Sequence, residues 1–536
     1  MFRRGCAPGA SFRLPGKYIW KQGGILLFCK RSGLCLQGIG GAVVSVEADV
    51  SDGLPGYLFV GYLASEVREA QERVRTAIKN LGLRLPPKKI TINLSPADIR
   101  KEGTGFDLAI AAAILAAYGA VPNEAGCDCI YAGELGLDGS VKGIPGILAM
   151  ADLARRSGFS RMFVPAANVS EASMIEGIRP IPVRSLRELF EMLTGQEPFR
   201  DGGKGAGFDG KDLNSYDVDF SEVNGQPLLR RAAEVAAAGK HNLLAIGPAG
   251  SGKTMVARRM PTIMPELTME EAIEISKLYS ISRLLSETEP LIRRRPFRAP
   301  HHSISMQAMT GGGSRPKPGE ISLATGGILF LDELPEFSRQ TLEALRQPLE
   351  ERCVTISRVH GSVCYPADFQ LVAAMNPCLC GHYPDMEKCT CTPSQIRRYL
   401  GKISRPILDR MDICVEAPAA SFEDISRAGK NEPSEAIRAR VKRAREIQAE
   451  RFLGTSVRCN GEMSGSQVKE FCRLEEKERQ FMERIYGEMG LSARTYDKIL
   501  KVARTAADLE ESDEICHRHL CEAVSYVRFK ERYWGK

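Results

Sequence analysis

The sequence lacks the features of a membrane or secreted protein. None of its apolar runs is long enough to cross a bilayer, and the short run at 25–28 lies among lysines and arginines, unlike the core of a signal peptide. Neither sign of charge dominates, since 73 Lys and Arg against 66 Asp and Glu leave a net charge of +7. We therefore expect a cytoplasmic protein without a membrane partner, whose mild basicity is compatible with nucleic-acid binding but does not establish it.

Cysteine, in contrast, is frequent, with 16 in the chain. In a large chain without a signal sequence, reduced thiols or metal ligands are expected rather than disulfides. Two C-x-C pairs stand out, Cys378 with Cys380 and Cys389 with Cys391. Four thiolates at this spacing can bind Zn²⁺ tetrahedrally, although the C-x-C bite is tighter than the usual C-x-x-C. The alternative is four reduced cysteines in an exposed loop.

Composition and periodicity divide the chain into five segments. Residues 1–35 show no clean periodicity, and we expect a disordered or atypical extension there. Residues 36–195 combine alternating apolar strands with apolar helices and predict a compact α+β domain. A glycine-rich linker at 196–214 leads to a nucleotide-binding domain at 215–420, and a helical region at 421–536 follows.

Local patterns predict individual elements. Apolar and polar residues alternate over Val44–Val50, which predicts a strand with one buried face. Asp107–Tyr118 is apolar nearly all round and predicts a core helix, and Asp138-Gly139 predicts a hairpin turn. Ser434–Arg451 predicts a helix with basic residues around an apolar side. Its basic face is either a solvated surface or a nucleic-acid contact.

The most informative motif lies in the nucleotide-binding domain. It fits the phosphate-binding loop pattern G-x-x-x-x-G-K-[ST] and reads Gly247-Pro248-Ala249-Gly250-Ser251-Gly252-Lys253-Thr254. An apolar strand precedes it and a helix follows, so backbone N–H groups and the helix N-terminus can surround phosphate oxygens. Lys253 is expected to reach the terminal phosphates of ATP, and the Thr254 hydroxyl to hold Mg²⁺.

Two further strands end in polar residues that complement this loop. The apolar run Ile328–Leu331 leads to Asp332 and Glu333. We expect Asp332 to steady Mg²⁺ and Glu333 to polarise the attacking water as general base. The apolar strand at 369–375 ends at Asn376, whose amide is expected to orient that water beside the γ-phosphate. Alternatively, Asn376 only begins a turn with the proline that follows.

The segment Leu408–Asp412 places Arg410 between two acids. Charge that develops on the γ-phosphoryl group needs a cation, and a neighbouring subunit often supplies it. Arg410 is the candidate for this cation. The alternative is a local salt bridge between Arg410 and an adjacent aspartate.

Together with Pro300-His301-His302-Ser303 and the run at 318–324, these motifs resemble the magnesium-chelatase-like branch of AAA+ ATPases. Over about residues 36–536 the chain resembles the ComM/YifB family, a competence-associated family of branch migration helicases. The resemblance implies an α/β protein with a AAA+ P-loop ATPase domain. It also implies an N-terminal Lon-protease-like (ribosomal S5 domain 2-like) α+β domain and a C-terminal helical domain of the magnesium-chelatase type.

The resemblance further implies a hexameric ring. In such a ring Arg410 would be the arginine finger acting in trans, and Arg494 would be the sensor arginine that the C-terminal helical domain brings to the nucleotide. The segments around Ser303–Gly319 and Val354–Tyr365 would form hairpins that face the pore. The histidine pair at 301–302 is expected to be structural or to contact substrate rather than to share a metal.

The first domain resembles the Lon protease fold through Lys101–Asp107 and Gly133–Gly136. A Lon protease uses a serine nucleophile that a lysine activates. The corresponding stretches here, Thr104-Gly105-Phe106 and Ile147–Met150, contain neither residue. Proteolysis is therefore not expected, and the domain is expected to serve assembly or DNA contact.

These features favour an ATP-hydrolysing ring motor that uses ATP and Mg²⁺ and acts on branched or single-stranded DNA. The resemblance points to branch migration of recombination intermediates during natural transformation. Two alternatives stay open. One is a metal-insertion motor for tetrapyrroles, as in magnesium chelatase, whose motor subunit lacks the Lon-like domain. The other is a protein-remodelling ATPase, for which the sequence names no client.

Overall fold

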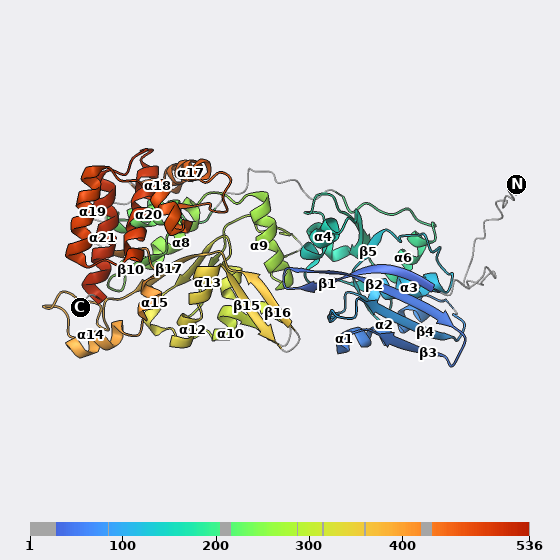
Figure 1. Cartoon of the computed structure of the whole chain (residues 1–536). Coiled ribbons are helices and arrows are strands. Elements are labelled where there is room, and N and C mark those ends of the chain that lie inside the picture. The colour runs from blue at the N-terminus through green and yellow to red at the C-terminus, as the bar shows by residue number, and fades with distance from the viewer. Residues whose placement is uncertain are drawn as a thin grey trace. The chain divides into compact units, whose positions relative to one another are not determined.

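The computed structural model describes residues 28–83, 85–203, 216–286, 288–313, 316–358, 361–419 and 431–534, which form two compact units (Figure 1). The first unit comprises the chain up to Gly207 together with Tyr279–Leu291. The second comprises Phe208–Leu278 and Ile292–Lys536. The boundary at 207–208 falls within the predicted linker 196–214, of which residues 204–214 lie outside the described residues.

The predicted extension 1–35 is too long. Strand β1 (Phe28–Gln37) pairs antiparallel with β2 (Gly40–Ser51) along its whole length, whereas residues 1–27 lie outside the described residues. The sequence of β1 shows no clean apolar alternation because one of its inward-facing residues is charged. Arg31 is 1% exposed, and its guanidinium donates to the backbone carbonyl of Ala125 at 3.2 Å.

The predicted nucleotide-binding domain 215–420 also needs correction, because Tyr279–Leu291 belongs to the first unit. This segment includes the end of helix α9 (Met269–Ile281). The Ser280 hydroxyl donates to the Glu171 carboxylate of the first unit, a contact between residues far apart in sequence that local pattern does not encode.

A seven-stranded mixed sheet forms the first unit, in the order β3-β4-β2-β1-β5-β8-β9. The strands not yet given are β3 (Gly56–Val60), β4 (Lys89–Ser95), β5 (Cys129–Tyr131), β8 (Arg161–Pro165) and β9 (Arg179–Val183). Strand β2 is antiparallel to both β1 and β4, and the remaining pairs are parallel. Alternate residues from Val44 to Val50 are buried, which confirms the predicted one-sided strand.

Helices cover the buried face of this sheet. They are α1 (Ser65–Arg68), α2 (Ala70–Asn80), α3 (Asp107–Ala117), α4 (Ile147–Arg156), α5 (Val169–Ala172) and α6 (Leu186–Leu193). Every residue of α3 is buried, and α3 packs against β1 and β2, as its all-round apolar sequence predicts. Strands β6 (Glu134–Leu135) and β7 (Val141–Lys142) confirm the hairpin predicted at Asp138-Gly139.

The second unit is built on a parallel five-stranded sheet in the order β11-β14-β17-β10-β18. Its strands are β10 (Leu243–Ile246), β11 (Phe297–Arg298), β14 (Ile328–Leu331), β17 (Gln370–Met375) and β18 (Ile413–Glu416). Residues of β10, β14 and β17 are buried without exception because helices cover the sheet. These helices include α7 (Pro227–Gly239) and α8 (Lys253–Ile263).

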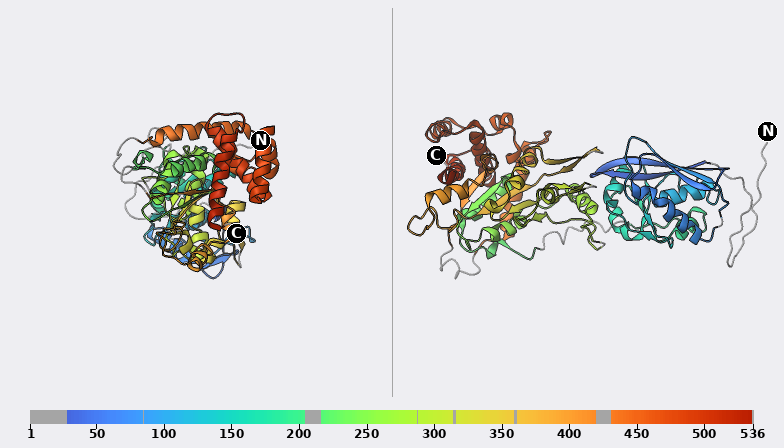
Figure 2. Two further views of the ribbon diagram at one scale, coloured as in Figure 1. Left: turned by 90° about the vertical axis from the view of Figure 1, so that its left-hand side faces the viewer. Right: turned by 90° about the horizontal axis from the view of Figure 1, so that it is seen from below.

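The C-terminal helices share one hydrophobic core with the sheet and with α7 and α8 (Figures 1 and 2). They are α17 (Ser434–Arg451), α18 (Gly465–Phe471), α19 (Glu476–Met489), α20 (Ala493–Leu509) and α21 (His517–Trp534). Helices α17 and α20 pack on α7, and α21 packs on β18. The predicted boundary at 420–421 lies outside the described residues, and the helices that follow it complete the same core.

Two predicted hairpin segments contain paired strands. Strands β12 (Gly311–Gly312) and β13 (Lys317–Pro318) follow the short helix α10 (Met306–Thr310), and β15 (Cys353–Arg358) pairs with β16 (Gly361–Pro366). Residues 314–315 and 359–360, between the paired strands, lie outside the described residues.

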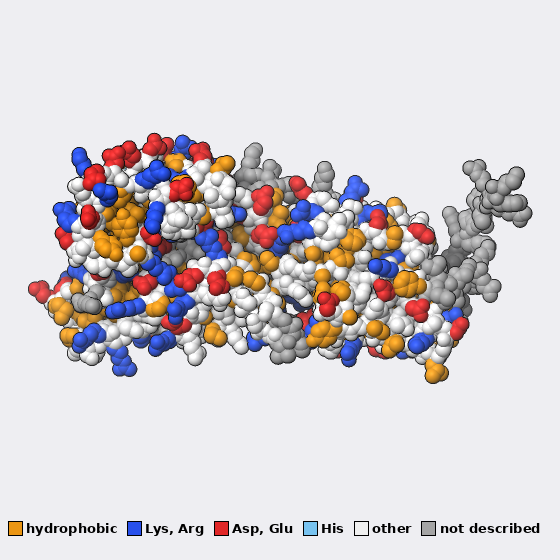
Figure 3. Space-filling model, viewed as in Figure 1, with side chains coloured by type: hydrophobic (Ala, Val, Ile, Leu, Met, Phe, Trp, Pro, Cys, Tyr) orange, Lys and Arg blue, Asp and Glu red, His pale blue; other side chains and the backbone are white. Residues whose placement is uncertain are grey.

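Among the described residues, the second unit also contains the α-helices α11 (Glu320–Leu323), α12 (Arg339–Glu343), α13 (Arg346–Glu351), α14 (Pro393–Leu400) and α15 (Arg405–Leu408). Within the described part of the chain, no helix combines the length and apolar character needed to span a membrane. On the face shown in Figure 3, acidic and basic side chains are interspersed, in keeping with the small net charge.

Candidate functional site

The predicted phosphate-binding loop connects β10 to α8 at the carboxyl edge of the parallel sheet. Gly250 and Gly252 have φ angles of +77° and +82°, which glycine adopts without strain. A side chain at Gly247 would clash with the backbone of Ala417. Helix α8 begins at Lys253, so its first N–H groups, which have no intrahelical acceptors, lie at the loop. The arrangement is that of an anion site.

The side chain of Lys253 is buried at the centre of this loop. Its Nζ donates to the carbonyls of Gly247 at 2.8 Å and Pro248 at 2.7 Å, and it lies 3.4 Å from Asn376 Oδ1. Burial lowers the pKa of Lys253, and the nearby carboxylate of Asp332 opposes that shift. A desolvated ammonium group gains strongly from a phosphate oxygen because little water screens the interaction.

Thr254 and Asp332 meet beside the lysine. The Thr254 hydroxyl donates to Asp332 Oδ2 at 2.7 Å, and Asp332 Oδ1 accepts from the backbone N–H of Glu333 at 3.0 Å. A hydroxyl and a carboxylate are hard oxygen ligands of the kind that Mg²⁺ prefers. These two residues fit the predicted Mg²⁺ site.

Glu333, two residues after the end of β14, has a left-handed backbone conformation with φ of +52°. Such conformations are costly for residues other than glycine and cluster at functional sites. Glu333 Oε2 lies 3.3 Å from His302 Nδ1. Sequence reasoning left the histidine pair at 301–302 between a structural and a substrate role, and did not place His302 beside the predicted general base.

Asn376 follows β17, which lies between β14 and β10 in the sheet. Polar residues at the ends of three adjacent parallel strands therefore converge, and ligands of open α/β sheets bind at this edge. The structure thus brings Lys253, Thr254, Asp332 and Asn376 together, with Glu333 next to Asp332 in the chain.

Arg410 lies at the opposite edge of the sheet. It precedes β18, and its carbonyl accepts from the side-chain amide of Asn242, which precedes β10. Because β10 and β18 run parallel, four residues of strand, roughly 13 Å, separate this edge from the phosphate-binding loop. The partner of Arg410 is Glu350, at 2.5 Å from Nη2 to Oε1, rather than a neighbouring aspartate, so the local salt-bridge alternative is not what the structure shows.

Arg494 joins Arg410 at this edge. At the start of α20, its Nη2 lies 3.3 Å from the same Glu350 oxygen. Lys498, one turn further, pairs with Asp412 at 3.1 Å and fixes α20 there. The structure therefore separates both predicted arginines from the chain's own phosphate-binding loop. Glu350 was not singled out from the sequence, since nothing in its local pattern marks it as the partner of two distant arginines.

The four cysteines of the two C-x-C pairs come together in the segment between β17 and α14. Cys378 is buried and Cys380, Cys389 and Cys391 are half-buried, and their sulfur atoms all lie within 4.8 Å of one another. The Sγ atom of Cys378 lies 3.3 Å from that of Cys380 and 3.8 Å from that of Cys389. The backbone N–H of His382 lowers the pKa of Cys380 to about 5.

Some basic residues of α17 bind other helices of the second unit, whereas others face solvent, as the solvated-surface alternative expects. Arg445 Nη2 donates to the carbonyl of Ala237 on α7 at 2.7 Å, and burial lowers the pKa of Arg445 to about 10. Arg440 pairs with Glu234 of α7 at 2.6 Å, and Arg451 pairs with a fully buried aspartate of α20 at 2.5 Å. Arg440, Lys442 and Arg443 are exposed, so the basic face divides between contacts inside the second unit and solvent.

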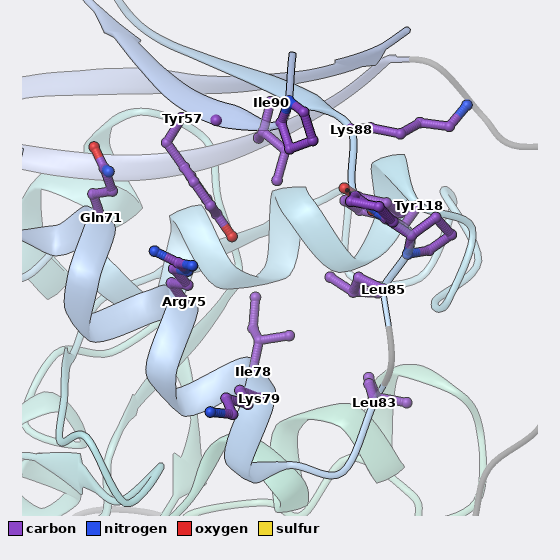
Figure 4. Close-up of a pocket in the computed structure, with 14 residues that line it drawn as sticks. Tyr57, Gln71, Arg75, Ile78, Lys79, Leu83, Leu85, Lys88, Ile90 and Tyr118 are labelled. Atoms are coloured by element: carbon purple, nitrogen blue, oxygen red, sulfur yellow. Dashed lines mark hydrogen bonds between the residues drawn. The ribbon is translucent and has the colours of Figure 1, made fainter. Parts of the chain in front are cut away.

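In the first unit, the first stretch compared with Lon proteases is half-buried at Thr104 and Gly105, and the second is buried. The Thr104 hydroxyl donates to Glu134, and α4 carries the Ile147–Met150 stretch with every residue buried. The same unit holds a cavity of about 460 Å³ between α2 and the β3–β4 region (Figure 4). Arg75 and Lys79 of α2 are exposed at this cavity, and Tyr57 of β3 reaches toward Arg75. None of the described residues that line it is acidic.

Comparison with known proteins adds the family context. Three family profiles match: magnesium chelatase subunit ChlI over residues 219–425, subunit ChlI of Mg-chelatase over 46–168, and the ChlI C-terminal part over 431–527. Competence protein ComM of Haemophilus influenzae is 41% identical over 495 residues, which cover 91% of this chain and 95% of that protein. Uncharacterized protein YifB of Escherichia coli is 42% identical over 490 residues, with the same coverage of both chains.

Similarity to Lon proteases covers a smaller part of the chain. Archaeal Lon protease of Methanocaldococcus jannaschii is 32% identical over 106 residues, which are 20% of this chain and 16% of that protein. Lon protease of Mycolicibacterium smegmatis is 29% identical over 143 residues, which are 26% of this chain and 18% of that protein.

Proposed function

The chain belongs to the ComM/YifB family of magnesium-chelatase-like AAA+ proteins, which implies an ATPase, and from this premise we propose that it is an ATP-driven ring motor acting on DNA. The observation that carries the proposal is the convergence of Lys253, Thr254, Asp332 and Asn376 at one edge of the parallel sheet. Each of these groups suits one part of a nucleoside triphosphate bound with Mg²⁺.

Each of these residues has its own role in ATP hydrolysis. Lys253 and the N–H groups of the loop hold phosphate oxygens, and Thr254 and Asp332 hold Mg²⁺, which when bound neutralises phosphate charge. Glu333 takes the proton of the attacking water, and Asn376 orients that water. The His302 ring, 3.3 Å from Glu333, keeps the carboxylate oriented.

The position of the two arginines supports a ring. Arg410 and Arg494 lie at the sheet edge opposite the chain's own loop, where they can serve the nucleotide of a neighbouring subunit. A cation that arrives only on assembly couples hydrolysis to the assembled state. We propose a hexamer, as the family resemblance implies.

DNA is the proposed substrate for two reasons. The relative from Haemophilus influenzae is named a competence protein, and the family resemblance implies branch migration of recombination intermediates during natural transformation. The cavity beside Arg75 and Lys79 combines cations with an aromatic ring, which suits a phosphate backbone and a stacked base. Specificity for DNA structure rather than sequence follows if phosphate contacts dominate.

A metal-insertion motor is the second candidate, favoured by the descriptions of the matching profiles. One profile described as a chelatase subunit covers residues 46–168, so the presence of the first unit does not by itself separate the two functions. The discriminating observation is what stimulates ATP turnover, because the motor subunit of a chelatase works with partner subunits that carry a porphyrin.

The test measures ATP turnover of the purified protein with Mg²⁺, alone and with single-stranded, duplex or four-way-junction DNA. We expect stimulation that is largest with the junction, together with movement of the branch point. If no DNA raises ATP turnover but porphyrin with chelatase partner subunits does, the second candidate would replace the proposal. Stimulation by a protein extract alone would favour a protein-remodelling ATPase.

A further inference from the structure

The segment between β17 and α14 has no regular secondary structure and carries the four cysteines. Residues 376–392 contain neither helix nor strand, and two of their apolar side chains point to solvent, with Leu379 63% and Met386 61% exposed. Turn hydrogen bonds, the Asp385 carboxylate and a ring contact between Tyr383 and Tyr533 order parts of this loop, and the four cysteines gather between them. Small elements of this kind are commonly fixed by a bound metal.

The sulfur atoms have the spacing of a tetrahedral zinc site. Zn–S bonds of about 2.3 Å place neighbouring sulfurs about 3.8 Å apart in a tetrahedron. The observed separations are 3.3 Å for Cys378 to Cys380, 3.8 Å for Cys378 to Cys389 and 3.6 Å for Cys380 to Cys389, and Cys391 completes the group of four. The backbone N–H of Tyr383 points at the Cys378 sulfur at 3.4 Å, a typical outer contact of a zinc thiolate.

Two neighbours of Lys253, the buried lysine of the phosphate-binding loop, adjoin the cysteine segment. On one side, Cys378 follows Asn376 with one proline between them, and Asn376 Oδ1 lies 3.4 Å from Lys253 Nζ. On the other side, Gly381 lies next to Pro248, so that a Cβ atom at Gly381 would be in van der Waals contact with the Pro248 Cα at 3.8 Å. Pro248 in turn supplies a carbonyl to Lys253 Nζ at 2.7 Å.

We propose that Cys378, Cys380, Cys389 and Cys391 bind one structural Zn²⁺ ion that holds Asn376 and Pro248 in the positions needed for ATP hydrolysis. The metal site stands on the thiol geometry alone, whereas its effect on hydrolysis rests on the proposed ATPase function. The ion would have no open coordination position and would take no part in the reaction. It positions the residues that do.

Metal content tests the site directly. The full-length protein, purified with reductant and without chelator, is expected to contain about one zinc per chain by mass spectrometry of the metal. A Cys380→Ser/Cys391→Ser variant is expected to lose it, and a Cys127→Ser/Cys521→Ser variant, which removes two exposed cysteines outside the cluster, is expected to keep it. Co²⁺ exchanged into the wild type should give the absorption bands of tetrahedral thiolate coordination. A wild-type protein that binds no zinc after incubation with ZnCl₂ would overturn the proposal.

Kinetics test the link to the nucleotide. Loss of zinc is expected to lower kcat about tenfold or more while the Kd for a fluorescent ATP analogue changes less than about threefold, since the lysine and loop remain. Asn376→Ala should reproduce the kinetic loss but keep its zinc, which separates the two causes even if the cysteine variant is less stable. A zinc-free protein with wild-type kcat would refute the positioning role. A wild type without ATPase activity would refute the proposed function, and zinc content would still decide the metal site.

Discussion

Arg410 and Arg494 bind the same oxygen of one carboxylate, Glu350 Oε1, at 2.5 and 3.3 Å. Arg410 is 8% exposed, whereas Arg494 and Glu350 lie at the surface. Three groups that are distant in sequence thus form one charged cluster on the edge opposite the phosphate-binding loop. Two cations sharing one anion leave net positive charge there, which a phosphate from another subunit can complement.

Subunit mixing tests whether these arginines act in trans. Lys253→Ala and Arg410→Ala are each expected to abolish turnover in uniform rings. In mixed rings, an Arg410→Ala subunit keeps its own loop and receives Arg410 from a Lys253→Ala neighbour, so activity should reappear. Phosphate release across mixing ratios measures this, with a maximum expected at intermediate ratios. Activity that never exceeds the sum of the two uniform samples would mean that Arg410 serves its own chain.

Glu333→Gln is expected to stop hydrolysis without preventing nucleotide binding, because it removes the base but no phosphate or Mg²⁺ ligand. We expect kcat to fall at least about a hundredfold. The Kd for a fluorescent ATP analogue should stay near the wild-type value, whereas Lys253→Ala should lose binding. Glu336→Gln, three residues on and paired with Lys402 at the surface, is the matched control and should retain wild-type turnover. Equal losses in both glutamine variants would argue against Glu333 as the base.

His241 makes the stability of the second unit depend on pH. It is completely buried, and this burial lowers the pKa of His241 to about 4, although Asp412 opposes the shift. The unfolded state, with an ordinary pKa near 6.5, takes up the proton first as pH falls. Unfolding free energy is therefore lost from about pH 6.5 down to about pH 4, and by pH 5 this one group accounts for about 2 kcal/mol.

The measurement uses Trp534 as a reporter. Its Nε1 donates to the Leu400 carbonyl at 3.2 Å, and in a Trp20→Phe background it is the only tryptophan. Denaturant unfolding gives the free energy of unfolding at pH 7 and at pH 5. The decrease between the two pH values should be about 2 kcal/mol smaller in His241→Gln than in the wild type. Replacement of exposed His517 by Gln should leave the difference unchanged. A wild-type difference that survives in His241→Gln would assign the pH dependence to other groups.

Removal of two cations from the cavity of the first unit should weaken DNA binding. For Arg75→Ala/Lys79→Ala we expect lower affinity for junction DNA and a salt dependence whose slope is shallower by about 0.7–0.9 per lost phosphate contact. Anisotropy titrations at several salt concentrations measure both quantities. Lys30→Ala/Lys142→Ala removes the same charge from exposed positions on β1 and β7, so it controls for net charge. If both variants lose affinity equally, the cavity is not the contact.

The motifs of the nucleotide site could be predicted because each consists of a few consecutive residues. The glycines, Lys253 and Thr254 follow one strand, and Asp332 and Asn376 each end another, so apolar runs and parallel pairing suffice to place them at a common edge. The same holds for the buried helix α3 and the hairpin at Asp138-Gly139, where the period of apolar residues or a turn dipeptide defines the element.

Only the tertiary structure determined the partners of charged side chains whose contacts lie far away in the sequence. Composition alone left the basic residues of α17 facing either water or nucleic acid, and only packing against α7 and α20 gave Arg445 and Arg451 their partners on those helices. Glu350 became the partner of Arg410 and Arg494, and Arg31 became a core residue, in the same way. The physical reason is that periodicity and turn chemistry act over a few residues, whereas the partner of a charged side chain is fixed only when distant elements pack together and remove competing water.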